Sequence, residues 1–492
     1  MGHTCAKLSS LGCFPCLLRI LGIRRSSHRR VDKYLIQEYS NDSSSSNDEL
    51  TSRCKYVDYP FLCDREIGEW VVFTRFMIIL RGSPGSGKSY LASYIKVRFP
   101  TAHVCSTDNH LSNANYFQVY QFDSERQEAA HRNCEEEAKL YARRGVSPLV
   151  IDISNMRSYE CRPYTEMARQ FDYTVIMVIP RTPWRFDVRS LAEKNVHNFS
   201  AEMISSMIAQ FEPIIYPLYY GWVFAGSPSC NIQSSPLPEK ADNIPPNEVT
   251  EKMVKEFRDA FFAALDVPYI HRRLALICGF DQAYAFGVSL DVDRDQLATF
   301  WSSAINPYFG GAPEPLQTVK ISRPHCTAFF ARYGHVPGAS EYAQRSTVRE
   351  ALLGSIRAFC VEGLFITKRT VGLRIHLSDP DQFAVWGGLD NESVDGCGEK
   401  LVPARSRPPG CRAHVTLALA SGVPAVETGF DALRIMDAEL DQRPDVCIID
   451  MPDGILREIL ASSSANSRSP DYVFYYQFST PKTIRLMYTA FY

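Results

Sequence analysis

The stretch that decides the fold of the first half of the chain runs from Phe76 to Ser89 and reads FMIILRGSPGSGKS. Its opening run of apolar residues is typical of a strand that is buried on both faces. The segment from Gly82 to Ser89 then matches Gly-x-x-x-x-Gly-Lys-Ser/Thr in full, and the apolar residues from Leu91 to Ile95 have helical spacing. Strand, glycine-rich loop and helix in this order predict a P-loop.

A P-loop holds the phosphates of a nucleotide. Backbone N–H groups turn inward around the phosphate oxygens at glycines, here Gly82, Gly85 and Gly87, and the helix N-terminus adds its positive dipole end. Lys88 would reach the β- and γ-phosphates, and the Ser89 hydroxyl would ligate Mg²⁺. The sequence therefore predicts ATP or GTP with Mg²⁺ in this domain, against the alternative of a glycine-rich turn that arose by chance.

Two further apolar runs, Leu149 to Asp152 and Val175 to Ile179, read as buried strands and predict an α/β domain with a mainly parallel sheet. Asp152 ends its strand where a partner for Mg²⁺ is needed. Asp108, at the end of the expected second strand, stands where a base would accept a proton from a hydroxyl substrate, or where a helix cap would lie. Arg185 would close over the phosphates, unless it is an ordinary solvated arginine.

Length and composition set the frame. A chain of 492 residues favours two domains plus extensions, and we predict a nucleotide-binding domain over 56–268 and a second domain over 269–492. A net charge of −2 excludes a global basic field for gathering nucleic acid, so that any RNA contact must come from a local patch. Fifteen cysteines, scattered without paired metal-ligand spacing except Cys13 and Cys16, favour a reducing intracellular compartment.

The N-terminal extension, residues 1–55, has the pattern of a membrane-targeting segment followed by a polar linker. Cys5, Cys13 and Cys16 lie in an apolar stretch that arginines follow, and no run reaches the roughly 20 apolar residues of a spanning helix. Palmitate on these cysteines and arginines on anionic headgroups would hold the protein on the cytosolic face of a membrane. The alternative is a disordered or cleaved leader.

The second domain has its own signal. Two of the eleven histidines, His325 and His414, are followed two places later by threonine, in segments that read as short strands. The strand period of two puts each histidine on the same face as Thr327 or Thr416. His376 has serine at the corresponding place, and we interpret it as a core or surface residue.

Two such pairs predict a phosphodiester site that needs no metal. Opening a five-membered cyclic phosphate requires a base for the attacking water and an acid for the departing oxygen. Histidine suits both roles because its ordinary pKa is ~6.5. Threonine hydroxyls can hold the non-bridging oxygens as charge builds up. We favour His414 as the base and His325 as the acid, and the alternative for each is a satisfied structural histidine.

From about Phe76 onward the sequence resembles the 2′,3′-cyclic-nucleotide 3′-phosphodiesterases of myelin, within the two-histidine phosphoesterase superfamily. The matching segments are the P-loop, Trp184-Arg185, Glu193-Lys194-Asn195, Pro217 to Trp222, His325-Cys326-Thr327, Tyr333-Gly334, Pro337-Gly338-Ala339, Glu341 to Gln344 and Arg412 to Leu417. The mammalian members end in a prenylation box, which Ala490-Phe491-Tyr492 do not match, so we expect the N-terminal cysteines to replace it.

The resemblance implies a polynucleotide-kinase-like P-loop domain followed by an α+β, two-lobed phosphodiesterase domain with antiparallel sheets and one histidine-threonine pair in each lobe. It implies hydrolysis of 2′,3′-cyclic nucleotides or cyclic RNA ends to 2′-phosphates. By position, Phe330 would stack on the base, Arg412 would contact phosphate or RNA, and Val426 would line the base pocket. Phe330 has the wrong strand parity to share a face with His325, so it reaches the substrate only if the strand ends or bends there.

Two other functions stay open at this point. One is an RNA-end-healing enzyme that also phosphorylates a 5′-hydroxyl, without the large domain that a ligase would need. The other is a membrane-bound scaffold that binds RNA or cytoskeletal proteins. Two intact histidine-threonine pairs argue for an enzyme over a scaffold.

Overall fold

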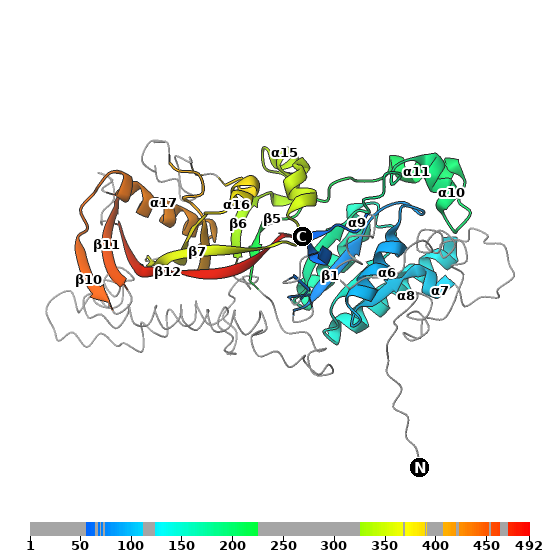
Figure 1. The fold of residues 1–492 in the computed structure, drawn as a ribbon, viewed down its shortest axis with the longest axis horizontal. Helices are drawn as coiled ribbons and strands as arrows, with labels where there is room; N and C mark the ends of the chain where they lie inside the picture. The colour runs from blue at the N-terminus through cyan, green and yellow to red at the C-terminus, as the bar shows by residue number, and fades with distance from the viewer. Residues whose placement is uncertain are drawn as a thin grey trace, which may run out of the picture.

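The structure is a computed structural model that describes residues 56–63, 67–68, 70–71, 74–111, 124–224, 325–367, 370–388, 390, 407–419, 423–451, 454–462 and 471–492. Within these residues an α/β domain lies beside a domain of antiparallel strands, and the C-terminus lies between them (Figure 1). The N-terminal cysteines and the predicted boundary after residue 268 lie outside the described residues.

The α/β domain contains a four-stranded sheet in which every pairing is parallel, in the order β2-β3-β1-β4. Its strands are β1 (Phe76–Leu80), β2 (His103–Ser106), β3 (Leu149–Asp152) and β4 (Thr174–Val178). Its helices are α4 (Pro60–Cys63), α6 (Lys88–Arg98), α7 (Thr107–Leu111), α8 (Ser124–Arg143), α9 (Ser158–Gln170), α10 (Val188–Lys194) and α11 (Ala201–Ala209). The predicted parallel sheet is confirmed.

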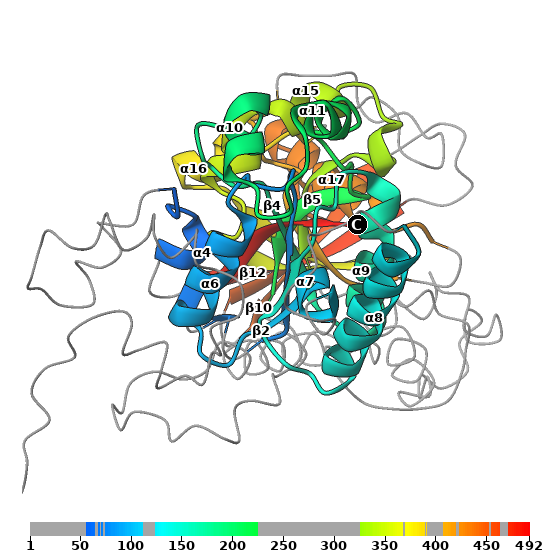
Figure 2. The same ribbon diagram turned by 90° about the vertical axis from the view of Figure 1, so that its right-hand side faces the viewer.

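Helices cover both faces of this sheet, which is why its strands are continuous apolar runs. Figure 2 shows α4 and α6 on one side of the strands and α8 and α9 on the other. Ile78 of β1 packs in one core cluster with residues of α6, whereas Met77 and Ile79 pack in another with residues of α8 and α9. Alternate side chains of one strand therefore build two separate cores.

The second domain is built on an antiparallel sheet in which β10-β11-β12-β7-β8-β9 are neighbours, while β5 pairs with both β12 and β6. Its strands are β5 (Tyr219–Val223), β6 (His325–Phe330), β7 (Ile356–Ile366), β8 (Thr370–His376), β9 (His414–Leu419), β10 (Cys447–Met451), β11 (Gly454–Ser462) and β12 (Asp471–Phe491). Its helical segments are η3 (Arg332–Gly334), α15 (Ala339–Gln344), η4 (Thr347–Ala351), α16 (Pro380–Val385) and α17 (Val426–Leu440). The predicted antiparallel architecture is confirmed.

Two long strands run through both lobes of this domain. The pairing of β7 with β12 shifts register between Gln477 and Lys482, and the pairing of β7 with β8 shifts between Val361 and Gly363. On one side of the shifts β12 pairs with β5, and β5 pairs with β6. On the other side β7 pairs with β8, and β8 pairs with β9. Each lobe therefore ends in one of the two predicted histidine strands.

Strand β5 corrects the predicted domain organisation. It falls inside the range 56–268 assigned to the first domain, yet it pairs with β12 and β6 of the second sheet. All five of its residues are buried, so its sequence looks like that of the parallel strands, and only the pairing partner distinguishes them.

The two domains share packing. The Thr489 hydroxyl of β12 donates a hydrogen bond to the Val175 carbonyl of β4 over 2.9 Å. Met487 and Val223 belong to the same apolar cluster as Ile78 of the parallel sheet. The end of β12 therefore closes the core of the first domain.

Among the described residues no helix is long and apolar enough to cross a membrane. The cysteines in these ranges form no disulfide bond with one another.

Candidate active site

The two predicted histidine strands meet at the junction of the lobes. In the described part of the sheet β6 pairs only with β5 and β9 only with β8, so each exposes one edge. These edges contact one another, and the Cys326 thiol of β6 interacts with the backbone of His414 in β9. His325 also lowers the pKa of His414 through its charge. The two histidine-threonine pairs therefore belong to one site.

A bulge in β6 resolves the parity problem of Phe330. Gly221 of β5 pairs with Thr327, but the preceding residue of β5, Tyr220, pairs with Phe329, so Ala328 is an extra residue. Beyond the bulge Phe330 pairs with Tyr219, which lies on the same face of β5 as Gly221. The bulge thus turns Phe330, whose side chain is 50% exposed, onto the face of His325 and Thr327.

Strand β9 repeats the same irregularity. Thr416 pairs with Gly372 of β8, but Ala418 pairs with the preceding residue of β8, so Leu417 is the extra residue. In both strands the bulge comes directly after the threonine, and in both the threonine lies opposite a glycine. A Cβ on Gly221 would lie 3.1 Å from the Thr327 Cα, and one on Gly372 would lie 2.4 Å from the Phe365 ring. Only glycine fits these two positions.

The environment of His414 favours its neutral form. Burial lowers its pKa to about 4; the backbone hydrogen bond to Arg412 opposes this shift, and the charges of Arg412 and His325 add to it. Its Nδ1 lies 2.8 Å from the Arg412 carbonyl oxygen. Because a carbonyl can only accept, Nδ1 carries the proton, and Nε2 of the neutral ring is the basic nitrogen.

A tight turn before β9 fixes the carbonyl that orients His414. The Asp390 carboxylate accepts hydrogen bonds from the backbone N–H groups of Gly410 and Arg412, at 2.9 and 3.0 Å. The same carboxylate accepts from the Trp386 indole N–H over 2.8 Å. Asp390 thus holds the turn whose Arg412 carbonyl sets the tautomer of His414.

Helix α17 packs against the back of the His414 ring. A Cβ on Gly429 would lie 2.9 Å from Cε1 of His414, so a glycine is required where the helix meets the ring. Val426, 45% exposed, lies three residues earlier on the same face of α17. This position agrees with the wall of a base pocket beside His414, which stays a prediction for Val426.

The environment of His325 is aromatic. The Tyr219 ring stacks on the imidazole with centroids 4.3 Å apart, and the Tyr219 hydroxyl lies 3.3 Å from Nδ1. Phe491 of β12 in turn stacks on the Tyr219 ring, again with ring centroids 4.3 Å apart. The two histidines therefore sit in different surroundings although their sequence motifs are alike.

Arg412 is placed differently from simple expectation, whereas His376 is a surface residue as interpreted from the sequence. Arg412 is 9% exposed, and its guanidinium lies 4.4 Å from the centroid of the Phe430 ring. Its contact with phosphate or RNA stays a prediction, and its charge acts on His414. His376 is exposed at the end of β8, with its Nδ1 3.4 Å from the Glu362 carboxylate.

The P-loop of the first domain has the predicted form. Gly85 and Gly87 have φ values of 82° and 100°, in the left-handed region that glycine adopts readily. A Cβ on Gly85 would lie 2.7 Å from the Leu191 carbonyl oxygen. The Lys88 ammonium donates to the Ser83 carbonyl over 3.1 Å, inside the loop. Loop, lysine and Ser89 at the start of α6 fit the phosphates of a nucleotide with Mg²⁺.

The predicted acids surround the P-loop lysine. Burial lowers the pKa of Lys88, while the charges of Asp152, at the end of β3, and Asp108, in α7, raise it. His197 joins them, with Nε2 3.6 Å from the Asp108 carboxylate. The structure therefore brings lysine, two acids and an additional histidine together around one loop.

Arg185 lies on the other side of this loop region. Its guanidinium donates to the Thr182 carbonyl over 3.4 Å, and it lines a cavity of about 270 Å³ together with Arg81, Arg181 and Arg349. The cavity lies between the two domains, since Tyr59 and Glu350 also line it. Closure of Arg185 over nucleotide phosphates stays a prediction.

Sequence reasoning missed the residues that support the histidines. Asp390 carries no motif, and Tyr219 lies in the matching segment Pro217 to Trp222 without a role assigned to it; each is separated from its histidine by many residues in sequence. His197 was also missed, because a lone histidine after a helix gives no signal. For Gly429 the sequence does contain a signal, because a glycine interrupts an otherwise helical pattern there.

Comparison with known proteins agrees with this division. Residues 308–459 match the family described as 2′,3′-cyclic nucleotide 3′-phosphodiesterase, and residues 77–214 match an AAA domain. The chain is 27% identical to the mouse 2′,3′-cyclic-nucleotide 3′-phosphodiesterase over 433 residues, which cover 88% of this chain and 87% of that protein. It is 28% identical to the protein of the same name from Pongo abelii over 421 residues, 85% of this chain and 84% of that protein.

A shorter similarity concerns a different protein. The chain is 33% identical to human NEDD4-binding protein 2 over 172 residues. This aligned segment makes up 34% of this chain and 9% of that protein. The matches that span most of the chain are the informative ones. The chain therefore combines an AAA-type domain with a domain of the 2′,3′-cyclic nucleotide 3′-phosphodiesterase family, and it is related to these phosphodiesterases over most of its length.

Proposed function

We propose that the C-terminal domain hydrolyses 2′,3′-cyclic nucleotides, or the cyclic phosphate at RNA 3′ ends, to 2′-phosphates by means of its two histidine-threonine pairs. The observation that carries this proposal is the meeting of β6 and β9, which present the two pairs with the same bulge after each threonine. The family match over residues 308–459 supports the same reaction.

In this mechanism His414 is the general base. Its Nδ1 proton is donated to the Arg412 carbonyl, which leaves Nε2 to accept a proton from the attacking water. The water oxygen forms a bond to phosphorus while the bond from phosphorus to the 3′-oxygen breaks. The low pKa of His414 keeps this nitrogen free of a proton at neutral pH.

His325 is the general acid. In the charged imidazolium both nitrogens carry a proton: Nδ1–H donates to the Tyr219 hydroxyl, and the Nε2 proton goes to the departing 3′-oxygen. The product carries a 2′-phosphate and a 3′-hydroxyl, and exchange with solvent returns His414 to the neutral form and His325 to the charged form. Each step balances with water as the only co-reactant.

The remaining residues hold the substrate. The Thr327 and Thr416 hydroxyls would donate to the non-bridging phosphate oxygens, where negative charge grows in the transition state. Phe330, half exposed on the same face, would stack on the base. All of these groups are neutral or cationic, so the reaction as proposed does not require a metal ion.

We propose a second function for the AAA-type domain, on the grouping of Lys88, Asp108 and Asp152. The P-loop amides and Lys88 would hold the phosphates of ATP or GTP, and Ser89 with Asp152 would hold Mg²⁺, which neutralises phosphate charge when bound. Asp108 would accept the proton of a 5′-hydroxyl. The protein would then act on both ends of cleaved RNA.

The N-terminal extension would place these activities at a membrane. Cys5, Cys13 and Cys16 with the arginines that follow supply the two signals that stable attachment requires. Cytoskeletal proteins at the cytosolic face are the further partners that this location would favour.

The first prediction concerns the two histidines. With adenosine 2′,3′-cyclic phosphate in EDTA, the full chain should release 2′-AMP and no 3′-AMP. Replacing His325 or His414 by alanine should lower kcat on the order of 10²–10⁴-fold, the usual contribution of an acid or base. His376→Ala is the matched control and should keep full activity, because that side chain is exposed and pairs with Glu362. Turnover that is indifferent to His325 and His414 would sink the proposal.

The second prediction concerns pH. A base loses activity as it is protonated, and His414 in its buried site has a pKa of about 4. The value of kcat/KM should therefore not fall as pH drops from 7 to about 5, and should decrease about tenfold per pH unit only below about 4. An acidic limb near pH 6.5, measured with protein that remains folded, would show that another group is the base.

The third prediction separates the two domains. Lys88→Met should abolish the binding of a fluorescent ATP analogue and leave 2′-AMP formation unchanged. Asp108→Asn should keep ATP binding and remove transfer of the γ-phosphate to a 5′-hydroxyl oligoribonucleotide. Asp187→Asn is the control, since Asp187 caps α10 at the surface and asparagine caps as well. Absence of transfer in the unaltered chain would restrict this domain to nucleotide binding.

The fourth prediction concerns the extension. Metabolic labelling with an alkynyl palmitate should mark the full chain through hydroxylamine-sensitive thioesters, and the triple variant Cys5→Ser, Cys13→Ser, Cys16→Ser should lose label and membrane association together. The matched control is Cys63→Ser, which removes an exposed thiol of the folded domain. Equal membrane association of the triple variant would refute this route of attachment.

A further inference from the structure

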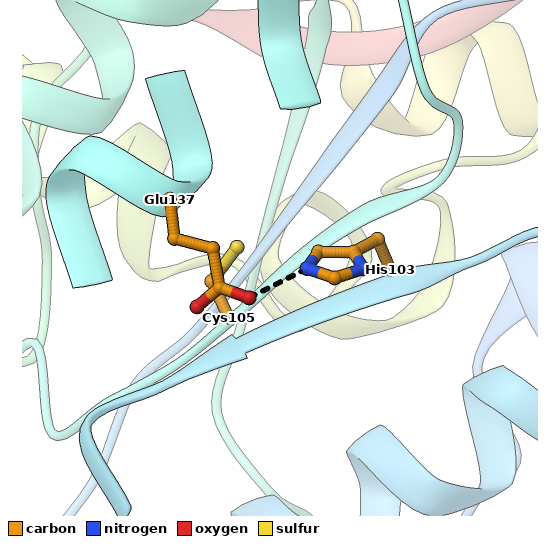
Figure 3. Close-up of side chains that lie close together, drawn as sticks. All are labelled: His103, Cys105 and Glu137. Atoms are coloured by element: carbon orange, nitrogen blue, oxygen red, sulfur yellow. Dashed lines mark hydrogen bonds and ion pairs between the residues drawn. The ribbon is translucent and has the colours of Figure 1, made fainter. Parts of the chain in front are cut away.

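A cluster of potential metal ligands lies in the AAA-type domain, outside both sites described above. His103 and Cys105 are two residues apart on β2, so they point to the same face of the sheet, and Glu137 of α8 faces them. Figure 3 shows the three side chains converging. Their ligand atoms all lie within 4.8 Å of one another.

Glu137 is the centre of this cluster. Its Oε1 lies 2.8 Å from Nε2 of His103, and its Oε2 lies 3.0 Å from Nε2 of His110 in α7. Burial raises the pKa of Glu137, but the hydrogen bonds and charges of the two histidines outweigh it and hold the pKa below its ordinary value. The group is therefore a carboxylate with an imidazole on each oxygen.

The supports of the cluster resemble those of metal sites. The Tyr141 ring, one turn after Glu137 on α8, stacks on the His103 imidazole with centroids 3.4 Å apart and fixes its orientation. The side chains of His103, Glu137 and His110 are 23%, 21% and 24% exposed, so an ion can enter from solvent. Cys105 closes the inner side and has no exposed surface.

An ion pair of the Glu137 carboxylate with two imidazoles accounts for the presence of His103 and His110, but not for that of the Cys105 thiol. A pair of imidazoles on one carboxylate needs no sulfur, and the inner wall could be any small apolar residue. Here the sulfur of Cys105 lies within reach of both Nε2 of His103 and the Glu137 carboxylate. Imidazole, thiolate and carboxylate are the ligands that Zn²⁺ uses in proteins.

We propose that His103, Cys105, Glu137 and His110 bind one Zn²⁺ ion. With Cys105 as thiolate, Glu137 as carboxylate and both imidazoles neutral, the four ligands carry two negative charges that the ion cancels. Neighbouring ligand atoms in a tetrahedral zinc site are ~3.5 Å apart, from bond lengths of roughly 2.0–2.3 Å. The side chains of His103, Cys105 and Glu137 therefore need to close by about 1 Å, with release of the thiol proton to solvent.

The ion would have a structural role. It would tie the edge strand β2 to α8 and to α7, the short helix that carries Asp108 of the predicted phosphoryl-transfer site. An edge strand followed by a helix of five residues has few other constraints, so crosslinking it through metal would fix Asp108 relative to Lys88.

The test is titration of the chelator-treated full chain with Co²⁺ under reducing conditions. Unaltered protein should take up one cobalt with a near-ultraviolet thiolate charge-transfer band and the visible bands of four-coordinate cobalt, and Zn²⁺ should displace it. Cys105→Ser should abolish the charge-transfer band. His103→Gln, Glu137→Gln and His110→Gln should each weaken zinc binding by at least about 100-fold, since even changes outside the ligand shell cost roughly 10–100-fold.

Cys161→Ser is the matched control, because this buried thiol lies in the same core cluster but contacts the Asn155 carbonyl rather than the histidines. It should keep the full cobalt spectrum. Circular dichroism of each variant checks folding, and the partly exposed Glu137→Gln serves if Cys105→Ser does not fold. A charge-transfer band that survives Cys105→Ser in folded protein, or zinc affinity unchanged by His103→Gln and Glu137→Gln, would overturn the proposal, and unchanged affinity in His110→Gln would remove His110 from the site.

Discussion

The structure depends on two long strands, β7 and β12, whose ladder runs through both lobes of the phosphodiesterase domain. Their pairing extends from Phe474 opposite Ile366 to Met487 opposite Ile356, interrupted by one register shift. Because each strand is continuous on both sides of the shift, the lobes cannot separate without breaking that ladder. The shift redirects the strands, and the outer strands β6 and β9 consequently meet edge to edge. This one pairing therefore brings together His325 and His414, which lie 89 positions apart in sequence.

Two matching motifs become chemically different through packing alone. Both are histidine, any residue and threonine, followed by a bulge opposite a glycine-bearing strand. His414 lies against Gly429 of a helix and donates to a carbonyl held by Asp390, so it is buried and neutral. His325 lies against the Tyr219 ring, whose hydroxyl is 3.3 Å from its Nδ1. In the proposed mechanism, the contacts that cover each ring would make an acid and a base from a repeated pattern.

The sequence predicted those features that local pattern controls. β6 and β9 begin at the two histidines, and β1 and β3 have the expected bounds, because apolar runs and the strand period are properties of a few consecutive residues. Phe330 could not be placed, since a bulge depends on the partner strand and leaves no mark in its own. Strand β5 was assigned to the wrong domain because Tyr219 to Val223 is as apolar as a parallel strand, and its partners are distant in sequence. Asp390 and Tyr219 escaped for the same reason.

The contacts between the two domains bear on whether their sites influence one another. Phe491 stacks on Tyr219, which stacks on His325, and the next residue, Tyr492, lies close enough to Arg81, beside the P-loop, to shift its pKa. Continuous packing does not by itself carry a signal, because coupling requires an element with two arrangements that both sites bias. The residues along this path are held by the β5–β12 ladder and by the hydrogen bond from Thr489 to Val175, which permit one arrangement. The described contacts therefore favour two sites held in fixed relation by the β5–β12 ladder, rather than one site that regulates the other.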